Sequence, residues 1–136
     1  EAGRKERYRA LAVRARRGRF SAVATGHQLD DQAETVLLHL LRGTSIEGLG
    51  GIPVKRPLAP GVELIRPLLA LTREEILAYL ETHDLDWRED ASNRDAKYAR
   101  NWVRREILPR LEKRAPGVKE RLAKIAAKVR AATGRS

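Results

Sequence analysis

A chain of 136 residues with 42% apolar side chains has the size and composition of one folded domain. The absence of cysteine excludes disulfides, thiolate metal sites and thiol catalysis within the chain. No apolar run approaches the ~20 residues of a membrane-spanning helix and no signal peptide is visible, so we expect a cytoplasmic protein without a membrane partner.

Positive charge is concentrated at the two ends of the chain. Residues 1–19 hold eight Lys or Arg against two acids, and residues 97–136 hold thirteen against three, whereas the segment between them is net acidic. Of the 28 cations, 21 are Arg, whose guanidinium group forks onto phosphates. This distribution fits either a highly charged, solvated surface or a surface that grips a polyanion such as nucleic acid.

The first third of the chain predicts the unit helix, strand, helix. Helical spacing of apolar residues predicts a helix over residues 4–17, and the run RFSAVATG (19–26) predicts a strand covered on both faces. A second helix is predicted from Asp31 to Gly43. This order predicts an α/β fold, here part of a doubly wound parallel-sheet nucleotide-binding domain that is mostly helical in this chain. In such folds ligands bind beyond the carboxyl ends of the strands, where His27 lies.

The middle of the chain predicts two short strands and a capped helix. After a Gly-rich loop, residues 54–69 read as two extended pieces around a Pro-Gly turn, and Pro57 and Pro67 predict that both lie at a sheet edge. Thr72 and Glu75 predict a capping box for a third helix, whose inward side chains are expected to be Ile76, Leu77 and Leu80.

Two further helices are predicted after a polar connection, at residues 97–114 and 118–132. The last helix has an apolar stripe of Val118, Leu122, Ile125, Ala126 and Val129. Its opposite, solvated face is expected to hold Lys119, Lys124, Lys128 and Arg130.

Four ionisable side chains crowd the start of the second helix: His27, Asp30, Asp31 and Glu34. Asp31 and Glu34 have the spacing of a capping box, which would explain two of the four. Adjacent carboxylates near a phosphate site are also how Mg²⁺ is commonly held, and His27 could bind the same centre, bind a phosphate or carry a proton. On a helical wheel Glu34 falls among leucines, so it needs a partner or a proton.

Arg100 and Arg104 fall in the middle of the apolar face of the fourth helix. Arginine is rarely buried without an anion, so two interpretations remain open. The pair could neutralise carboxylates such as Glu34 or Asp90, or it could clamp a phosphate in the same crevice. In the preceding polar loop, Asn93 could contact a ligand or form a turn.

The stretches ATGHQLDDQAETVLLHLLRGTSIEGLGGI (24–52) and DWREDASNRDAKYARNWVRREILPRL (86–111) resemble the catalytic domain of the tRNA(Ile)-lysidine synthetase family. The resemblance runs over about residues 4–112 and implies the adenine nucleotide alpha hydrolase-like fold of the N-type ATP pyrophosphatases. Members use ATP and Mg²⁺ to adenylate the wobble cytidine at C2 in an isoleucine tRNA with a CAU anticodon. The amine of free L-lysine then displaces AMP, and the resulting lysidine reads AUA.

The resemblance also implies site residues by motif position. His27, Asp30, Asp31 and Glu34 match the acidic catalytic motif, with Asp30 and Asp31 expected on the metal. Arg100 and Arg104 are expected on the nucleotide. Substrate or RNA contacts are expected from Asn93, Asn101 and Arg104.

The chain departs from the family pattern in one respect. The phosphate-cradling SGGxDS loop is absent, and the glycine-rich stretch GLGG (48–51) lacks its serines and aspartate. We therefore expect residues 1–114 to be the distal part of the catalytic domain and residues 115–136 to be a basic amphipathic C-terminal helix. The chain alone is expected to be inactive.

Two alternatives remain. The GHxxDDQ motif is shared with sibling tRNA cytidine-thiolating enzymes, which generally need cysteines that this chain lacks. A basic RNA-binding module without chemistry would explain the charged ends but not the four crowded side chains.

Overall fold

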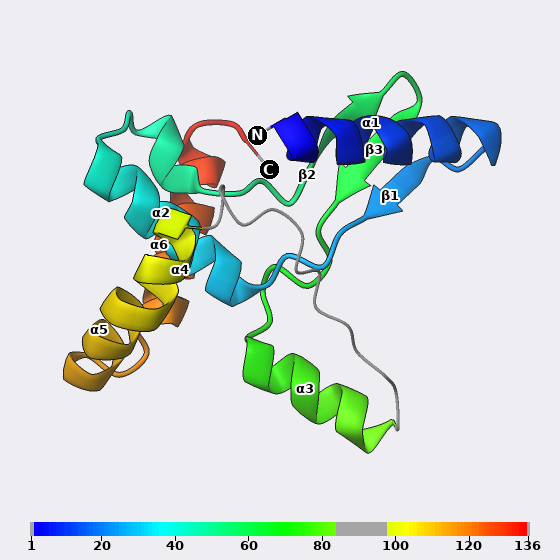
Figure 1. Cartoon of the computed structure of the whole chain (residues 1–136). Helices are drawn as coiled ribbons and strands as arrows, with labels where there is room; N and C mark the ends of the chain where they lie inside the picture. The colour runs from blue at the N-terminus through cyan, green and yellow to red at the C-terminus, as the bar shows by residue number, and fades with distance from the viewer. Residues whose placement is uncertain (1, 84–97, 136) are drawn as a thin grey trace.

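The computed structural model describes residues 2–83 and 98–135, and of residues 2–4 the backbone alone (Figure 1). The chain forms an α/β fold with a helical majority and a small mixed sheet. None of the helices within the described residues combines the length and apolar character needed to cross a bilayer. The elements are α1 (Ala2–Arg17), β1 (Ala22–Ala24), α2 (Leu29–Arg42), the 3₁₀ helix η1 (Glu47–Gly50), β2 (Lys55–Ala59), β3 (Val62–Ile65), α3 (Arg73–Thr82), α4 (Tyr98–Trp102), the π-helix η2 (Val103–Ile107), α5 (Leu108–Arg114) and α6 (Val118–Ala132).

The three strands form a sheet in the order β1-β3-β2, in which β1 is parallel and β2 antiparallel to β3. The predicted Pro-Gly turn joins β2 to β3, and its Gly61 has a φ of +77°, a conformation that favours glycine. Pro57 lies on the edge strand β2, as predicted, next to an irregularity in the register. The edge prediction is wrong for β3, which lies between the other two strands because Pro67 follows its end and leaves its amides unaffected.

The prediction that the first strand is covered on both faces is wrong for this chain. β1 has three residues, and Ala22 and Ala24 are exposed. α1 packs against the sheet and contacts all three strands, and Figure 1 shows it running across them. The other helices gather away from the sheet, so the described residues place no second layer on it.

The helical part of the molecule packs around α2. α4, η2 and α6 contact α2, and α3 stands apart from this group in Figure 1. The cluster of buried side chains at the centre consists of Ala33, Leu38, Val103 and Leu108, with Leu37 and Leu122 against it. A methyl-rich core of this kind is stabilised by the removal of apolar surface from water.

The predicted capping box of α3 is confirmed, since Thr72 Oγ1 accepts from the Glu75 amide at 3.1 Å and Glu75 accepts from the Thr72 amide at 3.1 Å. Ile76 is buried as predicted, but Leu77 is 40% exposed because α3 stands apart from the helical group.

Of the predicted helix over residues 97–114, the described residues 98–114 form one uninterrupted helical segment, with a π-helical turn in its middle. The Leu108 amide donates to the Val103 carbonyl, five residues back. Pro109 follows at once; it has no N–H and its ring clashes with a carbonyl four residues earlier in a regular helix. The wider turn before Pro109 relieves this clash.

The predicted last helix is confirmed as α6, but its predicted division into a buried face and a solvated face is only partly correct. Ala126 is fully buried, whereas Ile125 is half-exposed. Arg130, expected in solvent, is buried and donates to the Gly50 carbonyl at 2.6 Å, thereby joining α6 to η1. The helical spacing places Arg130 on the polar side of α6, but its aliphatic stem packs against Gly50 of η1. This close contact is possible because glycine has no side chain.

Candidate functional site

The start of α2 is capped one turn earlier than the sequence pattern predicts. Gln28 is the N-cap residue, and its amide donates to Asp31 Oδ2 at 2.7 Å in a reciprocal capping box. The predicted box between Asp31 and Glu34 is therefore wrong. The shift releases Glu34 from the helix end and leaves its side chain facing the neighbouring helix.

Glu34 is the centre of an ion-paired cluster between α2 and the helix that starts at α4. Its side chain is only 1% exposed. Arg104 donates to it in a bidentate arrangement, from Nε to Oε2 at 2.8 Å and from Nη2 to Oε1 at 3.1 Å. Arg100 Nη1 lies 3.5 Å from Oε1. This contact confirms the interpretation in which the two arginines pair with Glu34; Asp90, the other predicted partner, lies outside the described residues.

The backbone and side chain of Asp31 extend the cluster. Arg100 donates to the Asp31 carbonyl at 3.3 Å, and Asp31 Oδ1 lies 3.6 Å from Arg104 Nη2. Two carboxylates from α2 thus face two guanidinium groups that are about seventy residues away in the chain. Burial raises the pKa of Glu34 above its ordinary value, and the adjacent Arg104 guanidinium offsets part of that rise.

Asp30 connects α2 to two further helices, α3 and α6. Its Oδ1 accepts from the Arg73 amide at the start of α3, at 2.9 Å, and its Oδ2 accepts from Lys119 Nζ of α6, at 2.8 Å. Burial alone would raise the pKa of Asp30, but the hydrogen bonds from Lys119 and Arg73 lower it below its ordinary value. The same pairing raises the pKa of Lys119 against the opposing effect of burial.

In this structure the carboxylates of Asp30 and Asp31 accept hydrogen bonds from protein donors. Both oxygens of Asp30 are engaged, and one oxygen of Asp31 caps α2. Within residues 2–83 and 98–135, no three His, Cys, Asp or Glu side chains are grouped as metal ligands. The role of Asp30 and Asp31 on Mg²⁺ therefore stays a prediction.

His27 lies in the connection from β1 to α2, just beyond the carboxyl end of the strand. Its Nδ1 shares a hydrogen bond of 2.8 Å with Thr25 Oγ1. Thr25 is in turn tied to the sheet, because its amide donates to the Ile65 carbonyl at the end of β3. His27 therefore lies past the carboxyl end of the strand, as predicted, and its role in a ligand site remains a prediction.

Asn101 lies on α4 and is half-buried beside Arg100 in the chain. Asn93 lies outside the described residues, and so does Asp90. The expected substrate or RNA contacts of Asn93 and Asn101 therefore remain predictions.

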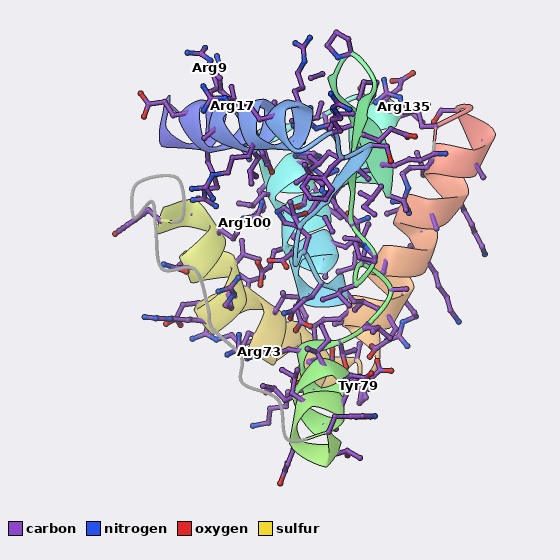
Figure 2. The ribbon with its side chains drawn as sticks, turned by 90° about the vertical axis from the view of Figure 1, so that its right-hand side faces the viewer. Arg9, Arg17, Arg73, Tyr79, Arg100 and Arg135 are labelled. Carbon is purple, nitrogen blue, oxygen red and sulfur yellow. The ribbon has the colours of Figure 1, made fainter. Side chains whose placement is uncertain are left out.

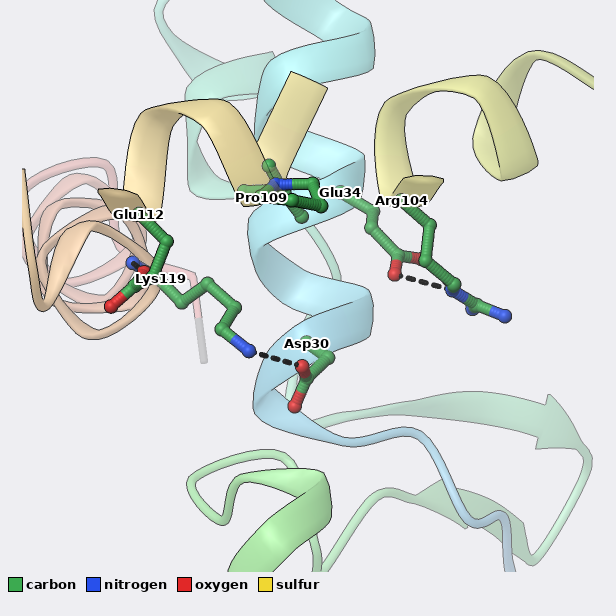
Figure 3. Close-up of a pocket in the computed structure, with 7 residues that line it drawn as sticks. Asp30, Glu34, Arg104, Pro109, Glu112 and Lys119 are labelled. Atoms are coloured by element: carbon green, nitrogen blue, oxygen red, sulfur yellow. Dashed lines mark hydrogen bonds and ion pairs between the residues drawn. The ribbon is translucent and has the colours of Figure 1, made fainter. Parts of the chain in front are cut away.

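A cavity of about 250 Å³ opens beside the ion-paired cluster (Figure 3). It brings together side chains of both signs from α2, the π-turn, α5 and α6, which Figure 3 shows converging from separate helices. Its walls are made by Asp30, Glu34, Arg104, Leu108, Pro109, Glu112 and Lys119.

Lys119 and Glu112 are site residues that the sequence pattern did not identify. Glu112 accepts from the amides of Gly117 and Lys119, at 2.6 and 3.4 Å, and so caps the start of α6. Lys119 lies in the first turn of α6, where a cation opposes the helix dipole. That unfavourable position was the signal in the sequence that Lys119 has an anionic partner elsewhere.

Comparison with known proteins identifies the family to which the chain belongs. The family model described as PP-loop domain matches residues 1–111. The chain is 46% identical over 132 residues to a protein of Pseudomonas aeruginosa named tRNA(Ile)-lysidine synthase. The match covers 97% of this chain and 29% of that protein. A protein of the same name from Alkalilimnicola ehrlichii is 47% identical over 125 residues, which are 92% of this chain and 27% of the relative. These matches confirm the resemblance that the motifs indicate.

A solved structure is also similar to the chain. The U34-tRNA thiolase NcsA from Methanococcus maripaludis, with its [4Fe-4S] cluster, superposes with a TM-score of 0.68 and 25% sequence identity. The match covers 90% of this chain and 41% of the thiolase. The α/β fold class is thereby confirmed. The chain spans less than a third of the length of the curated relatives just described.

Proposed function

Because the chain belongs to the PP-loop family, we propose that it forms part of a tRNA(Ile)-lysidine synthase. The reaction uses ATP to transfer an adenylyl group to the wobble cytidine at C2 in an isoleucine tRNA with a CAU anticodon, and pyrophosphate leaves. Mg²⁺ would neutralise charge on the ATP phosphates. The amine of L-lysine then attacks C2, and AMP leaves. The relatives that carry this name are 41–49% identical to the chain, which supports this choice.

One observation carries the proposal at the level of the site. Arg100 and Arg104 reach Glu34 on α2, the helix that follows the strand end carrying His27, and α/β folds bind ligands at such strand ends. Arg104 remains 45% exposed while Glu34 holds it. A guanidinium fixed in this way can face an anionic substrate group, such as a phosphate, at little further entropic cost.

The proposed roles of His27 and Lys119 follow from their side-chain chemistry and their contacts. His27 is suited to accept the proton that the lysine amine loses, since imidazole exchanges protons near neutral pH. Lys119 holds the carboxylate of Asp30 at the wall of the cavity. We assign residues 1–114 to the distal part of the catalytic domain and residues 115–136 to a basic helix, which shares the site through Lys119.

A second candidate function is thiolation of a tRNA base. The similar fold of the U34-tRNA thiolase favours it. That thiolase carries a [4Fe-4S] cluster, however, and clusters of this kind are held by cysteine thiolates, which this chain lacks. The identity to lysidine synthases is also higher than the identity to the thiolase.

The proposal is tested by a chimera in which this chain replaces the matched 132-residue segment of the Pseudomonas aeruginosa relative. We expect the purified chimera to incorporate labelled lysine into a CAU isoleucine tRNA transcript when ATP is present. The relative carrying its own segment through the same junctions is the control. A folded chimera that binds ATP and tRNA but transfers no lysine would contradict the proposal, and sulfur transfer in place of lysine would favour the second candidate.

A further inference from the structure

A groove between α1 and β2 lies apart from the candidate site. It has a volume of about 390 Å³ and shares no lining residue with the cavity beside Glu34. Its walls are made by Lys5, Tyr8, Arg9, Ala12, Arg56 and Leu58. Three of these six side chains are cations and none is a carboxylate, so the groove presents a concentrated positive charge.

The cations of the groove are not neutralised from within the described chain. Lys5 and Arg9 are exposed, and neither forms an ion pair with a described residue. Arg56 is held differently: its guanidinium lies 5.1 Å from the centre of the Tyr8 ring and donates to the Pro57 carbonyl at 3.2 Å. These contacts fix its position without cancelling its charge.

The charge of α1 is not explained by the stability of the helix itself. Arg14, Arg16 and Arg17 lie in the last turn, where the helix dipole favours cations. Lys5 lies near the opposite end, where the dipole disfavours them, and the first turn contains no acid to compensate. Figure 2 shows Arg9 and Arg17 along the same helix, so the positive surface extends beyond the groove.

We propose that the groove between α1 and β2 binds the phosphate backbone of RNA, with Lys5, Arg9 and Arg56 as the phosphate ligands. The choice of RNA among polyanions rests on the proposed function. A concave wall of Arg and Lys fits a polyphosphate chain, whereas helices that bind a lipid surface insert large apolar side chains. The apolar members of the groove, Ala12 and Leu58, lie half-buried in its wall.

The test measures binding of a fluorescein-labelled CAU isoleucine tRNA transcript to the full chain over a series of KCl concentrations. Lys5→Gln/Arg9→Gln should weaken binding at least about tenfold near ~0.1 M salt and reduce the slope of log affinity against log salt by about 1.4–1.8, as expected for two lost phosphate contacts. Arg56→Gln, on a different element, should reduce the slope by about half as much. Lys124→Gln/Lys128→Gln, which removes the same charge from exposed positions on α6, should leave the slope unchanged.

Equal losses in the α1 and α6 variants would mean that only net charge matters, and would overturn the proposal. Unchanged slopes in both groove variants would also overturn it, provided that thermal unfolding by circular dichroism matches the parent chain. Binding of the same variants to vesicles that contain phosphatidylserine is measured as well. If the groove variants lose vesicle binding but keep tRNA binding, the groove binds a membrane instead of RNA. Binding needs no catalysis, so a chimera that transfers no lysine would refute the proposed function and leave this result standing.

Discussion

Glu34 illustrates how one buried residue can organise the site. Its carboxylate is removed from water, which is costly for a charged group unless partners compensate. Arg104 supplies two hydrogen bonds and Arg100 supplies a longer contact. The free energy of the cluster therefore depends on Arg104 more than on any other neighbour of Glu34 that is described.

Arg104→Met should destabilise the fold in a manner that depends on pH. The pKa of Glu34 is already raised by burial, and loss of Arg104 raises it further. A carboxyl group with a raised folded-state pKa favours folding below its unfolded pKa, and this contribution is lost as the pH rises through the folded value. Near pH 4.5, the ordinary pKa of Glu, we expect Arg104→Met to change the free energy of unfolding little. Near neutral pH we expect it to lower the free energy of unfolding by about 2–3 kcal/mol.

Urea unfolding at the two pH values checks this prediction. The exposed neighbour Arg105 offers a matched control, and Arg105→Met should change the free energy of unfolding by less than about 0.5 kcal/mol at either pH. An equal loss for Arg104→Met at both pH values would show that packing of its stem, rather than its charge, supports Glu34.

The pair formed by Asp30 and Lys119 should contribute a coupling free energy of about 1 kcal/mol near neutral pH. The lowered pKa of Asp30 means that its contribution is present above the ordinary Asp value of 3.8 and is lost as the pH falls through the lower folded value. The raised pKa of Lys119 means that its contribution persists up to the ordinary Lys value of 10.5 and is lost as the pH rises through the higher folded value.

A double-mutant cycle with Asp30→Asn and Lys119→Met measures this coupling. It should be constant between about pH 5 and pH 9 and decline in strong acid. Additive effects of the two substitutions at neutral pH would mean that the ion pair contributes nothing.

At the scale of elements, local patterns predicted the helices well and the sheet poorly. The apolar spacing and cap residues of α2, α3 and α6 are local signals, so these helices are confirmed to within about one turn at their ends. The cap of α2 shifted because Gln28, an uncommon cap residue, forms the reciprocal bonds with Asp31. Coverage of β1 depends on packing layers that its own residues do not encode, and β3 became central through pairing on both sides.

The π-turn is an element whose consequence can be tested at Pro109. Arg104 lies within the turn and Pro109 follows it. Pro109→Ala restores an amide and removes the ring clash, so the turn can tighten to a regular α-helix and rotate Arg104 relative to α5. We expect no loss of melting temperature but a reduction of lysine incorporation by the chimera of about tenfold to hundredfold, since small displacements of positioning groups are costly.

Pro116→Ala, in the turn after α5, is the control variant for this prediction. It leaves the π-turn unaltered and should preserve lysine incorporation by the chimera. If Pro109→Ala retains full activity, the π-turn is a packing adjustment with no bearing on the position of Arg104.

At the scale of the whole molecule, the site depends on contacts between distant parts of the chain. The helical wheel predicted that Glu34 and the two arginines need partners, and motif resemblance pointed to the same residues. Lys119 and Arg130 were assigned to solvent because they lie opposite the apolar stripe of α6. Their partners, Asp30 and the Gly50 carbonyl, lie about eighty to ninety residues away. Long-range pairs of this kind follow from the packing of α6 on α2 and η1, which a local pattern does not contain.

The most direct measurement for the whole account is lysine incorporation by the chimera carrying Asp31→Asn. Asparagine retains an oxygen that can accept from the Gln28 amide, so the helix cap and the melting temperature should be nearly unchanged. If the start of α2 and the arginines form one reaction site, loss of the Asp31 charge should reduce ATP-dependent incorporation into CAU isoleucine tRNA by about hundredfold or more. Incorporation close to that of the parent chimera would contradict the account.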